Sequence, residues 1–240
     1  MTIMEFFGCT CVTFGLPLAM FIITIAKDPI RIIILIASAF FWLLSFLISS
    51  LLWFVVTPLR TKLVFGLVFS VLFQEVFRFL IYKLLRKAES GLKKVTDNSE
   101  QITSNKHILA YVAGLGFGII SGAFSLVNVL ADALGPATMG LKDGSDLFFL
   151  TSAATALCFI MLHTFWSVVF FSALDTRNYV HLLWVLVSHM VVSCLTLFNQ
   201  QELYLASLLP AYCIMVATGC MAFYVAGGTF RSFAATLKFK

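Results

Sequence analysis

Long uncharged apolar stretches alternate with short polar connections along almost the whole chain. Most stretches have about 20 or more residues, which is the length that a helix needs to cross the hydrocarbon core of a bilayer. The alternation of apolar and polar residues over about ten positions that marks a membrane β-strand does not occur. The pattern therefore predicts an all-α integral membrane protein with seven transmembrane helices. The predicted spans, which form a single membrane domain over residues 1–240, are 5–26, 30–56, 63–85, 108–130, 147–171, 180–198 and 203–225.

The composition agrees with this prediction. Of the 240 residues, 61% are hydrophobic and 11% are charged, whereas a soluble domain carries about 25% charged residues. A soluble fold is therefore excluded. The 6 cysteines lie in or beside apolar stretches, so we expect them to be packing side chains rather than disulfides or zinc ligands.

Lysine and arginine residues are shared unevenly between the two sides that seven spans would create. Arg60, Lys62 and Lys142 fall on one side, whereas the first, third and fifth connections and the C-terminal tail carry nearly all the others. Because cytosolic connections are enriched in lysine and arginine, we predict a lumenal or extracellular N-terminus and a cytosolic C-terminus. We attribute the net charge of +5 to this topology and expect no nucleic-acid partner.

Three glycines spaced four residues apart, Gly114, Gly118 and Gly122, lie in the fourth predicted span. A glycine inside a soluble helix costs about 1 kcal/mol relative to alanine, but in a membrane it lets a neighbouring helix approach closely. Ser121 and Ser125 share the helical face of these glycines. We predict that this glycine ladder packs against another helix, which belongs either to the chain's own bundle or to a partner.

Glu75 and Arg78 lie near the middle of the third predicted span. Their spacing places them on one face of a helix, where opposite charges can pair. An unpaired arginine at this depth would cost about 2.5–3.5 kcal/mol. We predict a structural intramembrane ion pair, and a proton or ion path is the alternative.

His163 and His189 are the other ionisable residues deep in the predicted spans, one in the fifth and one in the sixth. Each can be a neutral imidazole hydrogen-bonded inside the bundle, and metal ligation or catalysis are the rival interpretations. Two histidines make half a zinc site, and neither an HExxH motif nor a third deep histidine or cysteine accompanies them. We predict no metal and no cofactor.

No motif supports intramembrane catalysis. The residue two before Ser121 is Ile119 rather than glycine, so the setting of an intramembrane serine protease is missing. Asp28, Asp132 and Asp175 lie at the ends of spans, whereas an aspartyl protease needs two aspartates that share a proton in mid-span. The residues favour a non-catalytic membrane assembly protein, and a channel or transporter that uses Glu75/Arg78 and His163/His189 is the alternative.

Short motifs occur in order along all seven predicted spans. They are Glu5-Phe-Phe-Gly-Cys9, Ala39-Phe-Phe-Trp-Leu43, Gln74-Glu-Val-Phe-Arg78, Tyr82-Lys83, the glycine ladder, Ala131-Asp-Ala-Leu-Gly-Pro136, His163-Thr-Phe-Trp166, Ser188-His189 and Ala226-Gly-Gly228. With these motifs the chain resembles the Aph (anterior pharynx defective) subunit family of gamma-secretase over nearly its whole length. Two of its connections look more like those of an invertebrate member.

The resemblance implies a non-catalytic scaffold that assembles with nicastrin, presenilin and the presenilin enhancer subunit. The complex cleaves single-span proteins such as Notch and the amyloid precursor. The resemblance also implies that the complex occurs in the endoplasmic reticulum, Golgi, plasma membrane and endosomes. By resemblance, the glycine ladder is an assembly motif, and His163 and His189 help to hold presenilin and support activity. We therefore expect a presenilin chain end to dock in a hydrophilic recess lined by these two histidines.

Overall fold

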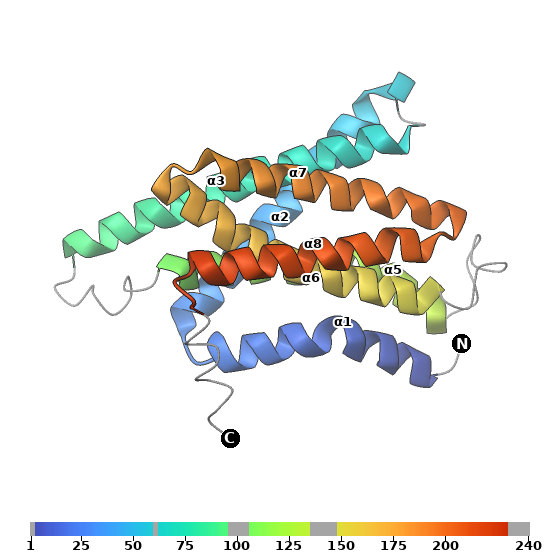
Figure 1. Cartoon of the computed structure of the whole chain (residues 1–240), viewed down its shortest axis with the longest axis horizontal. Coiled ribbons are helices and arrows are strands. Elements are labelled where there is room, and N and C mark those ends of the chain that lie inside the picture. The colour runs from blue at the N-terminus through green and yellow to red at the C-terminus, as the bar shows by residue number, and fades with distance from the viewer. Residues whose placement is uncertain (1–2, 60–61, 96–105, 135–147, 230–240) are drawn as a thin grey trace.

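The computed structural model of the chain describes the backbone of residues 3–59, 62–95, 106–134 and 148–229. Within these ranges, the structure does not describe the side chains of residues 3, 5, 92–95 and 128–134. Arg60, Lys142 and the side chain of Asp132, on which predictions above depend, are therefore not described. The described backbone consists of helices, with no strand among its elements, and the helices form an elongated bundle (Figure 1).

Seven helices are long and apolar enough to cross a membrane, the sixth of them counted together with the 3-10 turn that follows it. This confirms the predicted fold class. The main helices are α1 (Ile3–Thr24), α2 (Pro29–Val55), α3 (Leu63–Val95), α5 (Lys106–Leu134), α6 (Phe148–Thr176), α7 (Tyr179–Leu195) and α8 (Tyr204–Val225). Two short 3-10 helices, η1 (Thr57–Leu59) and η2 (Thr196–Gln201), follow α2 and α7.

Polar residues just before the spans define where two helices begin. The side chain of Asp28 accepts hydrogen bonds from the backbone N–H groups of Ile30 (3.0 Å) and Arg31 (3.4 Å) at the start of α2. Asn178 caps the start of α7 in the same way. Such caps satisfy N–H groups that have no partner within the helix.

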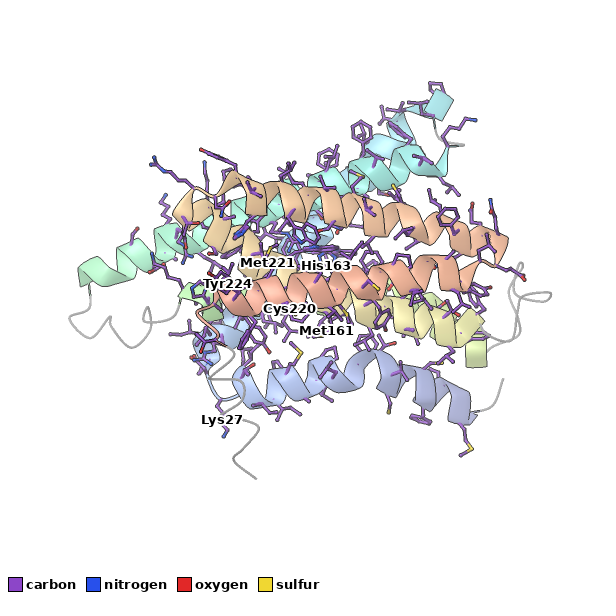
Figure 2. All side chains as sticks on the ribbon, in the orientation of Figure 1. Lys27, Met161, His163, Cys220, Met221 and Tyr224 are labelled. Atoms are coloured by element: carbon purple, nitrogen blue, oxygen red, sulfur yellow. The ribbon has the colours of Figure 1, made fainter. Side chains whose placement is uncertain are left out.

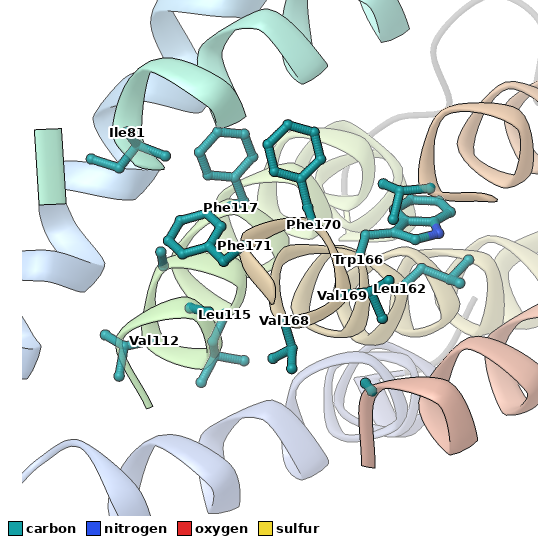
Figure 3. Close-up of a cluster of buried hydrophobic side chains, with 14 of the residues drawn as sticks. Ile81, Val112, Leu115, Phe117, Leu162, Trp166, Val168, Val169, Phe170 and Phe171 are labelled. Carbon is teal, nitrogen blue, oxygen red and sulfur yellow. The ribbon is translucent and has the colours of Figure 1, made fainter. Parts of the chain in front are cut away.

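The helix α6 lies at the centre of the bundle. It packs against α1, α5, α7 and α8, while α2 packs across α5 and α3. Figure 3 shows part of the core, where Phe117 of α5 lies near Phe170 and Phe171 of α6, and Trp166 lies further along α6. All four side chains are buried, as expected for a helix that is apolar around its whole circumference.

The helix α3 lies at the edge of the bundle and continues past the predicted end of its span, residue 85, to Val95. Its backbone packs on α2 and, to a smaller extent, on α7 and α5. Apolar residues of α3, Phe77, Ile81 and Leu85, are buried in the same core cluster as residues of α6. Long polar side chains of α3 add hydrogen bonds to α6, which reach across from Arg78 and Arg86. Both apolar packing and polar bonds therefore hold α3 against the core.

Candidate functional site

Glu75 and Arg78 form an ion pair inside the membrane-spanning part of α3. Arg78 Nε lies 3.1 Å from Glu75 Oε2, and the two side chains are 5% exposed or less. Because both charges are removed from water, each of them needs further hydrogen-bond partners.

Arg78 finds its further partners on α6. Its Nη1 donates to the backbone oxygen of His163 (3.1 Å) and to Ser167 Oγ. Its Nη2 lies 2.9 Å from His163 Nδ1. Since a guanidinium group only donates hydrogen bonds, Nδ1 of His163 is the acceptor. The guanidinium also lies 5.2 Å from the centre of the Phe117 ring, within the range of a cation–π contact.

Glu75 finds its further partner on α7. His189 Nδ1 lies 2.6 Å from Glu75 Oε1, and because an ionised carboxylate only accepts, His189 donates. Trp166 of α6 stacks on the His189 ring with 4.3 Å between ring centres. The Trp166 indole N–H in turn donates to Ser188 Oγ at 2.9 Å. The two histidines thus use the same ring nitrogen in opposite roles.

We call Glu75, Arg78, His163 and His189 the ion cluster. These residues come from three helices, α3, α6 and α7, and none of them is more than 4% exposed. Figure 2 shows His163 in the interior of the bundle. Losing one partner would leave a buried charge without compensation, so the arrangement ties the three helices to one relative position.

A polar recess lies beside the ion cluster, in the half of the bundle where α1 begins. It is a cavity of about 340 Å³ between α3, α5, α6, α7 and η2. Thr155 Oγ1 has no hydrogen-bond partner among the described residues. Gln74, the neighbour of Glu75, lines the recess, donates to Ser70 Oγ (3.1 Å) and accepts from Trp42 Nε1 (3.2 Å). The polar lining residues are Ser70, Gln74, Ser121, Ser125, Ser152, Thr155, Ser193, Thr196 and Asn199.

The recess has no ionisable side chain among its described lining residues. His163 and His189 do not line it, because both are enclosed in the ion cluster. The structure therefore separates two features that the sequence analysis placed together, the histidines and the hydrophilic recess. It also gives no continuous row of ionisable groups through the described bundle that would favour an ion path.

The glycine ladder packs against α6 of the same chain. A Cβ atom at Gly118 would lie 2.5 Å from the backbone oxygen of Ile160, and one at Gly122 would lie 2.5 Å from Ile160 Cδ1. A Cβ atom at Gly114 would lie 2.8 Å from the backbone oxygen of His163. These distances are well inside normal contact, so the near absence of side chains is what lets α5 and α6 touch.

The serines predicted to share the ladder face contribute to the polar recess. Ser121 and Ser125 line the polar recess, and Ser125 Oγ donates to the backbone oxygen of Gly122 at 3.0 Å. One wall of the recess is therefore the continuation of the helix face that carries the ladder.

A second polar cluster joins α3 to α6 at the opposite end of the bundle. Arg86 Nε lies 3.1 Å from Asp175 Oδ1, and Arg86 Nη1 lies 3.0 Å from Glu89 Oε2. Tyr82 donates to Asp175 Oδ1 at 2.9 Å. We call this group the Arg86–Asp175 clamp. Two ties, the ion cluster and the clamp, thus hold α3 along the length of α6.

Residues 4–229 match the family model described as Aph-1 protein. The chain belongs to the Aph-1 family. It is 62% identical over 233 residues to the gamma-secretase subunit Aph-1 of Drosophila melanogaster, with 97% of each chain covered. It is 48% identical over 241 residues to the gamma-secretase subunit APH-1B of Mus musculus, with 97% of this chain and 92% of the relative covered. A third relative is the gamma-secretase subunit aph-1 of Caenorhabditis elegans, 29% identical over 253 residues, with 94% and 82% covered.

The Aph-1 assignment agrees with the resemblance that the sequence motifs carry. The greater identity to the fly protein than to the mouse protein fits an invertebrate member of the Aph-1 family. We therefore interpret the ion cluster, the polar recess and the glycine ladder as features of an Aph-1 chain.

Several residues of this Aph-1 chain escaped the sequence analysis. Ser152 and Thr155 of the recess stand one helical turn apart in the fifth span, a spacing that could have marked a polar face. The Arg86–Asp175 clamp left no local signal, because its partners are 89 residues apart. Gly116, which lies between two ladder glycines, contacts the backbone of Leu35 on α2.

Proposed function

We propose that this chain is the non-catalytic scaffold subunit of gamma-secretase and assembles with nicastrin, presenilin and the presenilin enhancer subunit. The relatives reported above are named as gamma-secretase subunits, which supports the role at the level of the complex. The observation that carries the proposal is a polar recess held open beside a buried ion cluster. In a protein that spans the membrane, such a polar recess has to be filled by water or by polar groups of another protein.

The recess fits an irregular end of the presenilin chain. Backbone that leaves the helical conformation inside a membrane survives only where protein or enclosed water satisfies its N–H and C=O groups. The hydroxyl and amide groups of the recess offer both donors and acceptors, and Thr155 Oγ1 has no hydrogen-bond partner among the described residues. The docking place of presenilin is therefore the recess itself, and His163 and His189 act from behind it by fixing α3, α6 and α7.

The complex cleaves single-span membrane proteins, and the scaffold supplies no catalytic group of its own. The N-terminus faces the lumen or the cell exterior, so the recess opens toward that side. The protein passes through the endoplasmic reticulum and Golgi to the plasma membrane and endosomes.

Affinity purification of the tagged full-length chain from insect-cell membranes in mild detergent tests this proposal. We expect nicastrin, presenilin and the presenilin enhancer subunit in the wild-type eluate. Ser152→Leu fills the recess and is expected to reduce presenilin recovery, whereas Cys213→Leu adds similar bulk at an exposed position of α8 and leaves it unchanged. Recovery of presenilin with Ser152→Leu at the wild-type level would contradict docking in the recess, and an eluate without any of the three partners would contradict the scaffold role.

A further inference from the structure

A small cavity lies beside the recess, between α6, α7, η2 and α8, and we call it the inner cavity. Its volume is about 10 Å³, which is close to the space that a single water molecule needs. Thr155, Phe159 and Thr196 line both the recess and the inner cavity, so they stand between the two. The other residues around the inner cavity are Cys158, Val192, Ser207, Leu208 and Ala211.

The hydroxyl group of Thr155 needs a hydrogen-bond partner in this part of the bundle. Its Oγ1 atom is buried and has no partner among the described residues. Buried polar groups are almost always hydrogen-bonded, to protein or to an ordered water, because an unpaired one lowers stability. Since the oxygen is buried, its partner has to be small and enclosed.

The other two hydroxyl groups of the inner cavity have already donated their protons. Thr196 Oγ1 donates to the backbone oxygen of Ser193 at 2.6 Å. Ser207 Oγ donates to Asn199 Oδ1 or to the backbone oxygen three residues earlier. Because a hydroxyl has one proton and two lone pairs, both oxygens can still accept a hydrogen bond. The inner cavity therefore offers two acceptors and, from Thr155, one donor.

We propose that the inner cavity binds one ordered water molecule, which accepts from Thr155 and donates to Thr196 and Ser207. A water molecule supplies the two donors and the acceptor that these groups require, and buried waters typically make about three hydrogen bonds. None of the described lining residues carries a charge, so an ion in the same place would be without compensation.

The water site joins three parts of the bundle. Thr155 belongs to α6, Thr196 begins η2 at the end of α7, and Ser207 belongs to α8. Because two of the residues around the water also line the recess, the site fixes this wall of the recess from behind. The proposal concerns the chain by itself and does not depend on the proposed function.

Radiolytic labelling of the full-length chain in detergent tests the proposal, since hydroxyl radicals formed from a bound water modify the side chains beside it. Cys158 lines the inner cavity but not the recess, and it is 1% exposed. Cys9 is 7% exposed and lines neither cavity. We expect Cys158 to be modified faster than Cys9, although Cys158 is the more deeply buried.

Thr155→Val keeps the shape of the side chain but removes the donor to the water. We expect this variant to lose most of the labelling of Cys158 and to lower the folded-to-unfolded ratio by about fivefold. Removal of a hydroxyl that has no partner would instead raise this ratio, so the sign of the stability change separates the two cases.

Thr164→Val is the matched control on the same helix. Thr164 is buried, donates to the backbone oxygen of Ile160 at 2.9 Å, and lines neither cavity. We therefore expect Thr164→Val to leave the labelling of Cys158 unchanged.

Two results would overturn the proposal. The first is wild-type labelling of Cys158 that is no faster than that of Cys9. The second is a Thr155→Val chain that is at least as stable as the wild type. If Thr155→Val does not fold, the wild-type comparison still decides, together with Thr155→Ser, which keeps the hydroxyl and is expected to keep the labelling of Cys158.

Discussion

Glu75 of α3 shares its carboxylate between Arg78 of its own helix and His189 of α7, with 2.6 Å between Glu75 Oε1 and His189 Nδ1. One side chain thereby links a local helical pair to a residue 114 positions away. Since Arg78 in turn reaches His163 and Ser167 on α6, the position of each of the three helices depends on the other two. Variants of these residues should therefore act together rather than separately.

Replacing Arg78 with leucine is expected to destabilise the protein by about 3–5 kcal/mol, because Glu75 would remain buried as a charge without its main partner. The double variant Glu75→Leu/Arg78→Leu should recover part of this loss, since it removes both charges. Thermal unfolding of the detergent-purified chain measures both variants. If the double variant is as unstable as Arg78→Leu, the loss of stability in Arg78→Leu does not come from the uncompensated charge of Glu75.

The opposite roles of the two histidines can be tested with asparagine. An asparagine amide offers both an acceptor oxygen and a donor nitrogen, so it can replace the acceptor of His163 or the donor of His189. We expect His189→Asn to be more stable than His189→Ala by about 1–2 kcal/mol, and the same order for the variants of His163. Equal unfolding temperatures for asparagine and alanine variants would mean that ring packing, rather than hydrogen bonding, is what the histidines supply.

Gly116 should be as intolerant of a side chain as the ladder itself. A Cβ atom there would collide with the Leu35 backbone, whose Cα lies at 3.2 Å, so Gly116→Ala has to push α2 away from α5. We expect a loss of about 1–3 kcal/mol for this overpacking. Gly15 of α1 is the matched control, since nothing lies within 4 Å of a Cβ atom there. Gly15→Ala is expected to gain about 0.5–1 kcal/mol from helix propensity, and a loss of similar size at both positions would contradict the packing argument.

The turn between α6 and α7 holds a non-glycine residue in the left-handed region, Arg177 with φ 56°. This conformation lets the N–H of Asn178 bond to the backbone oxygen of Ala173 at 2.8 Å and so closes α6. Glycine adopts it without steric cost, so we expect Arg177→Gly to stabilise the chain by about 0.5–1 kcal/mol. Arg177→Val should lower stability, because a β-branched residue is the least suited to positive φ. If both variants raise the unfolding temperature relative to the wild type, or both lower it, this explanation is refuted.

Local sequence determined the features that depend on one helix at a time. The seven spans follow from length and hydropathy, because an isolated segment in lipid can satisfy its backbone only as a helix. The pairing of Glu75 with Arg78 follows from their spacing of about one turn. The shared face of Gly114, Gly118 and Gly122 follows from the same periodicity.

Tertiary structure alone decided what those faces meet. The ladder could have packed on any small surface, and its choice of α6 depends on Ile160 and Ser167, which lie far along the chain. The histidines could have lined the recess. Instead His163 bonds to Arg78, which is 85 positions away, and His189 bonds to Glu75, which is 114 positions away. The recess itself belongs to four helices and the 3-10 turn η2. Helical periodicity specifies which side chains share a face, but the partner of that face depends on how all the helices pack at once, and no local pattern of residues contains that information.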